Sequence, residues 1–272
     1  MKKFLLFICV LFFTAVAQPS GYDIVFKGGR VMDPETNFDD IRNVGINGDR
    51  IVEISSSELK GNKIIDVSGL VVAPGFIDLH AHGQTNNAHR YQARDGVTTA
   101  LELEGGVTFL RKWIAGKIGK TIVNFGATVP HGSLRTMAMD KYQKDVRKIQ
   151  KTLNQEGFGS PKVEEMMALL GKSSYESLSN AEMQKTNELM LQYLEDGALG
   201  IGIPVGYYPG ATAGEIFSVY KFAAEREVPV YSHTRGFGLA GIQEAIADAT
   251  TSGASLHIVH ANSLSLGEIE TT

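Results

Sequence analysis

Two histidines, His80 and His82, stand two residues apart in an apolar run introduced by Pro74-Gly75. Side chains two apart on a β-strand lie on the same face, so two imidazoles with this spacing can bind one metal ion. Asp78 belongs to the same face of the predicted strand. His-x-His is a weak pattern alone, but at the carboxyl end of a strand it predicts a metal site.

Two later apolar runs also end in histidine, at His233 and His260. Neutral imidazole nitrogens at about 2.0 Å suit Zn²⁺, and a catalytic site leaves one position open for water. The alternative is two hydrogen-bonded core histidines, but the repeated placement at strand ends favours ligands. His257 lies on the opposite face of its predicted strand and His89 in a predicted polar loop, so we expect both to be structural.

Two carboxylates, Glu102 and Glu104, lie in another apolar run that starts near Val97. An acidic side chain inside a parallel strand is costly unless it is paired or bound to a metal. Glu104 is nearer the carboxyl end, so we expect it to bind or bridge the metal ions. Glu102 is then a hydrogen-bonded neighbour of the ligands, or the ligand itself.

These residues can meet only if their strands end at the same edge of one sheet. The chain after residue 70 has the alternating pattern of strands and helices that would form such a sheet. Apolar runs begin near Val71, Val97, Thr121, Leu199, Val228 and Ala254. Amphipathic helices are predicted between them, notably over 179–195 and 212–226, each opened by a Ser/Thr-x-x-Glu capping box. Strands alternating with helices predict an α/β fold with a parallel sheet. A longer interval, 137–170, predicts an inserted helical segment.

The first part of the chain predicts a small β module. Short strands are expected over 22–26, 43–46, 50–54 and 63–67, separated by the turn sequences Gly28-Gly29, Asp33-Pro34, Asn47-Gly48-Asp49 and Gly61-Asn62. About 50 residues hold little core, so this module must pack against another part of the protein.

The composition is that of a globular α/β protein. The chain has 272 residues, 43% hydrophobic residues and 30 glycines, which excludes collagen, coiled coil and disorder. Its 26 basic and 30 acidic residues leave a net charge of −4 without a basic cluster. We therefore expect a small-molecule substrate and no nucleic-acid partner.

The N-terminus has the pattern of a secretory signal peptide over residues 1–17. Lys2 and Lys3 precede an apolar stretch that ends in Ala15-Val16-Ala17. Cleavage after Ala17 removes the one cysteine, Cys9, so the mature chain forms no disulfide. We expect an exported protein, periplasmic or secreted, that is not held in a membrane after cleavage.

Several motifs together resemble the amidohydrolase superfamily, and within it the N-acyl-D-amino-acid deacylase (D-aminoacylase) branch. The segment from Ala73 to His82 is similar to the signature of the superfamily's first barrel strand. The branch is indicated by His131-Gly-Ser-Leu-Arg135, Gly206-Tyr-Tyr-Pro-Gly-Ala211, His233-Thr-Arg235 and His260-Ala-Asn262. The resemblance runs from about Tyr22 to the last residue.

The resemblance implies a TIM-type (β/α)₈ metal-dependent hydrolase barrel beside a small β-sandwich. Residues 18–72 would form the N-terminal part of the sandwich, and 73–272 an incomplete barrel of about six βα units. One or two Zn²⁺ ions are implied, with ligands from His80, His82, Glu104, His233 and His260. Relatives often carry cysteine on the second strand, where this chain has Glu102-Leu-Glu104.

Four loop residues are the candidates for substrate binding. They would polarise the substrate carbonyl or bind the substrate carboxylate, and they are His131, Tyr207, Tyr208 and Arg235. Arginine can donate two hydrogen bonds to a carboxylate. Relatives tend to have lysine two residues after the sixth-strand histidine, where this chain has Asn262.

The general-base aspartate implied for the eighth strand is expected beyond Thr272. We therefore expect this chain to be an N-terminal fragment of a longer enzyme, incompletely folded and inactive by itself, because six strands cannot close the barrel.

The expected activity of the parent enzyme is metal-dependent hydrolysis of a linear amide, most simply of N-acyl-D-amino acids. One alternative is a cyclic amidase or isoaspartyl-dipeptidase-type amidohydrolase. Those relatives usually place a carboxylated lysine between the metals, and residues 198–205 contain no lysine. An alternative of another class is a secreted, inactive metal-binding remnant.

Overall fold

The computed structural model describes residues 21–265 and 270, and it divides into two compact units, Met1–Pro74 and Gly75–Thr272. The predicted signal peptide lies outside the described residues. Among those residues, no helix combines the length and the apolar character needed to cross a membrane. Each unit is described by itself below.

The first unit is one β-sheet. Its strands are β1 (Tyr22–Asp33), β2 (Phe38–Asn47), β3 (Arg50–Ser55), β4 (Gly61–Asp66) and β5 (Val71–Val72). The order is β3-β2-β1-β4, with β5 also paired to β1. The β2–β3 hairpin turns at Gly48, whose φ of 57° suits glycine. The predicted strands and this turn are confirmed.

Gly28-Gly29 is not the turn that the sequence predicted. Both glycines lie inside β1, where the pairing with β2 shifts register between Phe26 and Gly29. Gly28 has a φ of 73°, and this left-handed residue lets the strand bulge and continue instead of turning back. The first strand is therefore 12 residues long, more than twice the predicted length.

The second unit contains the predicted parallel strands. They are β6 (Phe76–Asp78), β7 (Val97–Glu102), β8 (Asn124–Ala127), β9 (Val129–Pro130), β10 (Ile201–Pro204), β11 (Val230–His233) and β12 (Leu256–Ile258). They pair in parallel as two sheets, β6-β7-β8 and β12-β11-β10-β9. The run predicted to begin near Val71 is split, because Val71 and Val72 pair with β1 of the first unit.

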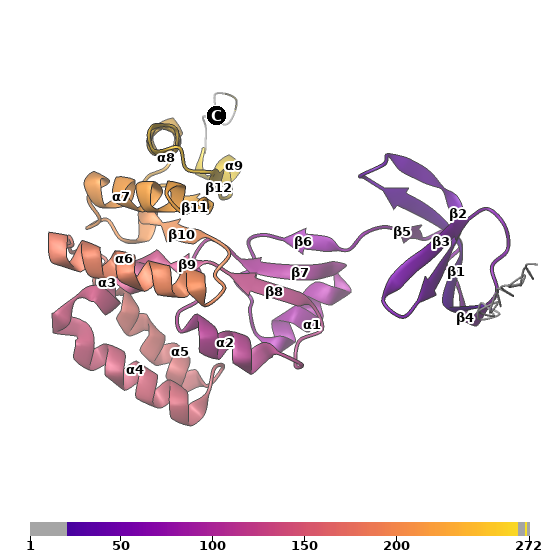
Figure 1. Cartoon of the computed structure of the whole chain (residues 1–272), viewed down its shortest axis with the longest axis horizontal. Helices are drawn as coiled ribbons and strands as arrows, with labels where there is room; N and C mark the ends of the chain where they lie inside the picture. The colour runs from indigo at the N-terminus through magenta and orange to yellow at the C-terminus, as the bar shows by residue number, and fades with distance from the viewer. Residues whose placement is uncertain (1–20, 266–269, 271–272) are drawn as a thin grey trace, which may run out of the picture. The chain divides into compact units, whose positions relative to one another are not determined.

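Helices separate these strands, as the α/β prediction requires, except that β8 passes into β9 through Thr128 alone. They are α1 (Asn86–Arg94), α2 (Leu110–Lys117), α6 (Asn180–Glu195), α7 (Ala213–Ala224), α8 (Leu239–Ser252) and the short α9 (Ala261–Leu264), with a 3₁₀ turn η3 (Val205–Tyr207). Figure 1 shows α6, α7 and α8 running beside the strands of the four-stranded sheet. His89 lies in α1 and is buried, so its predicted loop position was wrong.

The predicted helical insertion is present and begins earlier than expected. It comprises α3 (His131–Ala138), η1 (Asp140–Tyr142), α4 (Gln143–Glu156), α5 (Pro161–Met167) and η2 (Ala168–Gly171). Its apolar residues Leu134, Val146 and Ile149 join one core with Ile201 and Ile203 of β10. The insertion is therefore packed into the body of the second unit.

The two predicted capping boxes differ in the structure. At α6 the box is complete, because Ser179 accepts from the backbone of Glu182 and the Glu182 carboxylate accepts from the backbone of Ser179. At α7 Thr212 caps the helix, but the carboxylate of Glu215 is bound to Arg135 instead. The sequence pattern alone does not distinguish these two uses of glutamate.

Gly202 of β10 leaves room for the loop that follows β7. A Cβ atom at this position would lie 2.3 Å from the carbonyl oxygen of Glu104 and 2.6 Å from the Thr128 hydroxyl. That hydroxyl donates to the carbonyl of Leu103 over 2.9 Å. Strand β10 and the Thr128 junction thus determine where the Glu104 backbone lies.

We predict that Gly202→Ala destabilises the protein by about 1–3 kcal/mol, because the crowding atoms are backbone and a buried hydroxyl that cannot move aside. The matched control is Gly214→Ala in the first turn of α7, where an added Cβ would lie 3.9 Å from the Thr212 hydroxyl. Chemical denaturation of both variants measures the difference. Equal stability of Gly202→Ala and the wild type would contradict this account of the loop.

Candidate metal centre

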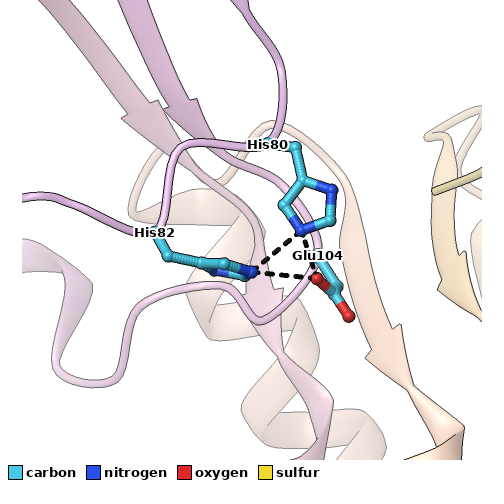
Figure 2. A group of neighbouring side chains, drawn as sticks. All are labelled: His80, His82 and Glu104. Atoms are coloured by element: carbon cyan, nitrogen blue, oxygen red, sulfur yellow. Dashed lines mark hydrogen bonds and ion pairs between the residues drawn. The ribbon is translucent and has the colours of Figure 1, made fainter. Parts of the chain in front are cut away.

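His80 and His82 follow β6 and present their imidazoles to the same point. The strand ends at Asp78, whose carboxylate accepts a hydrogen bond from the backbone of His80 over 2.9 Å. The histidines are therefore held in the loop beyond the strand, and His80 makes an isolated bridge to Glu102 of β7. Their Nε2 atoms lie 2.8 Å apart, as Figure 2 shows.

The carboxylate of Glu104 lies between two pairs of histidines. One oxygen, Oε2, is 2.5 Å from Nε2 of His80 and 3.1 Å from Nε2 of His82 (Figure 2). The other, Oε1, is 2.7 Å from Nδ1 of His233 and 3.6 Å from Nε2 of His260. Glu104 is only 3% exposed. A single buried carboxylate thus faces all four predicted ligand histidines.

Glu102 has a different position from Glu104. It is the last residue of β7, and its carboxylate lies 2.7 Å from Nδ1 of His82 while accepting from the backbone of Gly105 over 3.0 Å. This contact orients the His82 ring from the side opposite Glu104. Of the two glutamates that the sequence left open, the geometry brings Glu104 to the imidazole cluster and puts Glu102 behind it.

The second histidine pair comes from the neighbouring strands β11 and β12. His233 is the last residue of β11, and His260 immediately precedes α9, after β12, with a φ of 33°. Their ring centroids are 4.7 Å apart and nearly perpendicular. His257 is exposed beside Tyr231, outside this cluster.

The glutamates and histidines of the cluster shift one another's pKa values. Burial alone would raise the pKa of the Glu104 carboxyl, but the hydrogen bond to His233 and the positive charges of the histidines outweigh it and lower the pKa to about 2. For His82, burial acts to lower the pKa, whereas the hydrogen bond to Glu102 and the charge of Glu104 raise it overall. The carboxylate is thus held ionised among imidazoles.

The donor atoms fit a divalent metal ion. Two groups, His80 with His82 and Glu104, and Glu104 with His233 and His260, each bring their donor atoms within 4.8 Å of one another. Imidazole nitrogen and carboxylate oxygen are the donors that zinc and other transition metals use. A carboxylate shared by both groups can serve one ion or bridge two.

Two of the predicted substrate-binding residues are buried in a separate polar cluster. His131 is 1% exposed and Tyr208 is 3% exposed, and His131 Nδ1 lies 3.2 Å from the Tyr208 hydroxyl. Both surround the ion pair of Arg135 and Glu215, in which Arg135 Nε donates to Glu215 over 2.5 Å. His131 begins α3 instead of lying in a loop. In this structure these side chains bind one another, and their proposed contact with substrate stays a prediction.

The other two candidates differ in exposure. Tyr207 is 65% exposed, and its ring centroid lies 4.7 Å from that of His233, so it borders the candidate metal centre. Arg235 donates to Glu244 over 3.0 Å and to the carbonyl of Ala211 over 2.7 Å. Tyr207 is thus exposed beside the candidate metal centre, whereas Arg235 is held by these partners through Nε and Nη1 and has a buried Nη2 without a partner among the described residues.

Sequence reasoning missed the roles of Arg135 and Glu215. Arg135 is fully buried, and it also donates to the carbonyls of Ser173 and Glu176, so it joins α3, α7 and the segment before α6. In the sequence, Arg135 appeared only as the last residue of the motif His131-Gly-Ser-Leu-Arg135, and Glu215 only as the glutamate of a predicted capping box. No local pattern joins two residues that are 80 positions apart.

We predict that Glu104→Gln abolishes stable metal binding, whereas Glu102→Gln weakens metal affinity by about 10–100-fold, as expected for a residue that orients a ligand. Metal content by elemental analysis and competition with a chelator measure both effects. Equal losses in the two variants would show that the glutamates do not have the separate positions described above.

We predict that His131 makes the protein less stable as the pH falls. Burial, reinforced by the charge of Arg135, lowers the pKa of His131 to about 3, so the folded protein excludes a proton that the unfolded chain binds below about pH 6.5. Between pH 7 and pH 5 the free energy of unfolding should fall by about 2 kcal/mol more in the wild type than in His131→Asn. Identical pH dependence in denaturant titrations would contradict this.

Comparison with known proteins gives short sequence matches. No family model matches the chain. Dihydroorotase from Streptococcus pyogenes serotype M3 is 43% identical over 90 residues, which are 31% of this chain and 20% of that enzyme. Dihydroorotase from Lactococcus lactis is 38% identical over 90 residues, again 31% of this chain and 20% of the enzyme. The match thus spans about a fifth of these curated relatives.

The fold is similar to that of several solved enzymes. N-acyl-D-glutamate deacylase from Bordetella bronchiseptica, in complex with zinc and a phosphonate inhibitor, has a TM-score of 0.66 at 20% identity, covering 92% of this chain and 56% of that one. A D-aminoacylase with a binuclear metal centre has a TM-score of 0.64 at 21% identity, covering 86% and 50%. L-hydantoinase from Arthrobacter aurescens has a TM-score of 0.52 at 14% identity, covering 86% and 52%.

The predicted fold class is therefore confirmed: an α/β barrel-type unit of the kind found in metal-dependent hydrolases, together with a small β unit. The chain spans about half the length of these solved structures. The chain is thus similar in fold to solved deacylases and, over 90 residues, similar in sequence to dihydroorotases, which agrees with the resemblance of its motifs to the amidohydrolase superfamily.

Proposed function

We propose that the whole protein is a metal-dependent hydrolase that cleaves a linear amide, with N-acyl-D-amino acids as its substrate class. The observation that carries the proposal is the Glu104 carboxylate, which faces His80 and His82 with one oxygen and His233 with the other. This arrangement supplies a carboxylate and imidazole nitrogen donors at one point, as amide hydrolysis at a metal centre requires.

Zn²⁺ is the proposed metal, because imidazole and carboxylate donors suit it and one position can stay open. When bound, it polarises a carbonyl group as a Lewis acid and makes a nucleophile available at neutral pH. The ligands would be His80, His82, Glu104, His233 and His260. Their number allows one ion or two.

The protein's own residues prepare this chemistry. Glu102 fixes the tautomer and ring position of His82 through the Nδ1 contact, so that Nε2 faces the cluster. Glu104 stays ionised because the histidines around it stabilise its charge. Tyr207 borders the cluster at His233 and is exposed, which suits contact with the substrate on the open side.

The substrate class rests on fold similarity and on the ligand set. The solved deacylases have the higher TM-scores, whereas the hydantoinase has 0.52. Residues 198–205, which include β10, contain no lysine that could be carboxylated, and Glu104 stands between the two histidine pairs. Both features favour a linear amide over a cyclic one.

A cyclic amide is the second candidate, and the sequence matches favour it. The dihydroorotases are more than a third identical to this chain, although over only 90 residues. Export through the predicted signal peptide belongs to the proposal as well, and places the reaction in the periplasm or outside the cell.

The deciding experiment combines metal content with substrate selectivity. We expect one or two equivalents of zinc in the purified whole protein, and faster hydrolysis of N-acetyl-D-amino acids than of the matched N-acetyl-L-amino acids. A chelator should remove the activity, and added zinc should restore it. Zinc with turnover of dihydroorotate or hydantoins alone would favour the cyclic amidase, and absence of metal would contradict the assignment of the histidines.

A further inference from the structure

A small polar cavity of the second unit is lined by residues of β11, α7 and α8. The centre of a water molecule can occupy about 10 Å³ of it, which is room for about one water molecule. Its polar lining includes Tyr220 of α7, Asp248 of α8 and Arg235, which follows β11. Ser232 of β11 lines it too. Because consecutive residues of a strand face opposite sides, the cavity lies behind His233.

Two buried polar atoms of the lining residues have no hydrogen-bond partner among the described residues. They are the Tyr220 hydroxyl and Nη2 of Arg235. Tyr220 is 1% exposed. The other nitrogens of Arg235 are already used, since Nε donates to Glu244 and Nη1 to the carbonyl of Ala211. A buried polar atom is costly unless it is hydrogen-bonded, so the cavity must supply a partner for both atoms.

The ionisable groups around the cavity lie within electrostatic reach of one another. Burial, and next the charge of Glu244, raise the pKa of Asp248, while the charge of Arg235 lowers it. Burial raises the pKa of Tyr220 to about 12, and the side chain of Ser232 acts in the opposite direction. The charges of Asp248 and Glu244 add to the increase. Tyr220 therefore keeps its proton at neutral pH and can donate it in a hydrogen bond.

The ligand that these groups can accept is small, neutral and able both to donate and to accept hydrogen bonds. An anion would be repelled by Asp248 and Glu244, and a cation by the guanidinium of Arg235. A water molecule can accept from Arg235 Nη2 and donate to a carboxylate oxygen of Asp248, while the Tyr220 hydroxyl supplies a third hydrogen bond. Three hydrogen bonds are typical of a buried water.

We propose that one ordered water molecule is bound in this cavity as part of the fold, where it bridges Tyr220, Arg235 and Asp248. Through these bonds it joins α7 and α8 to the end of β11, and so supports the strand that positions His233. The inference does not depend on the proposed function, since it concerns groups on the other side of this strand from the candidate metal centre.

The first test locates the water directly. We expect the crystal structure of the whole protein, at a resolution that shows ordered water, to contain a density peak within about 3.2 Å of the Tyr220 hydroxyl, Arg235 Nη2 and an Asp248 oxygen. In solution, oxygen-17 magnetic relaxation dispersion should count one long-lived water fewer in Ala245→Val, which adds two methyl groups to the cavity lining. The matched control is Ala247→Val, which is exposed on the same helix and outside the lining.

Two results of this test would overturn the proposal. One is an unchanged count of long-lived waters in Ala245→Val. The other is a crystal structure in which Arg235 Nη2 binds Asp248 directly, with no water between them.

The second test uses the direction of a stability change. Tyr220→Phe removes only the hydroxyl. Because the bound water makes a hydrogen bond with that hydroxyl, we expect the equilibrium constant for unfolding to rise about 2–10-fold in denaturant titrations. Tyr175→Phe, at a tyrosine that is 86% exposed, should leave it unchanged.

An unchanged or lower unfolding constant in Tyr220→Phe would show that the hydroxyl is buried without a partner, and would contradict the bridging water. An increase together with a crystal structure in which Ser232 alone binds the hydroxyl would overturn the proposal as well.

Discussion

A carboxylate that is 3% exposed must be compensated on every side, and this requirement organises the candidate metal centre around Glu104. The imidazoles come from the β6 loop, from β11 and from the turn after β12, so both parallel sheets contribute. Thr128 stands where β8 passes into β9 and binds the backbone of the Glu104 loop. Gly202 leaves the space that this loop occupies. The position of one charge therefore depends on strands of both sheets.

Arg135 and Glu215 form a second buried group of charges, which stabilises the fold away from the candidate metal centre. It joins α3 of the helical insertion to the first turn of α7, and Arg135 also satisfies the carbonyls of Ser173 and Glu176. Removing either partner would leave an uncompensated buried charge. His131 and Tyr208 pack around this pair, which explains why two residues with the appearance of ligand-binding groups are enclosed.

Much of the fold could be predicted because it depends on local signals. Alternating apolar runs and amphipathic stretches predicted the parallel strands and helices of the second unit, and Ser179-x-x-Glu182 predicted the start of α6. The errors concern features that depend on contacts between residues far apart in the chain. Gly28-Gly29 forms a bulge because β2 pairs with β1 on both sides of it, and the run at Val71 is divided because its first residues pair with β1. His89 is buried in α1, where its ring contacts the side chains of Thr121 and Gln84.

The sequence by itself determined the donor types of the candidate site and their positions at strand ends, because a period of two and the edge of a parallel sheet are local and topological properties. It could not choose between Glu102 and Glu104, since two residues on one face differ only by their depth in the folded protein. Tertiary structure decided that Glu104 faces the imidazoles and Glu102 supports His82. It also decided that the buried polar atoms of Tyr220 and Arg235, without partners among the described residues, belong to the lining of one cavity, because burial and pairing depend on contacts between segments that are separate in the chain.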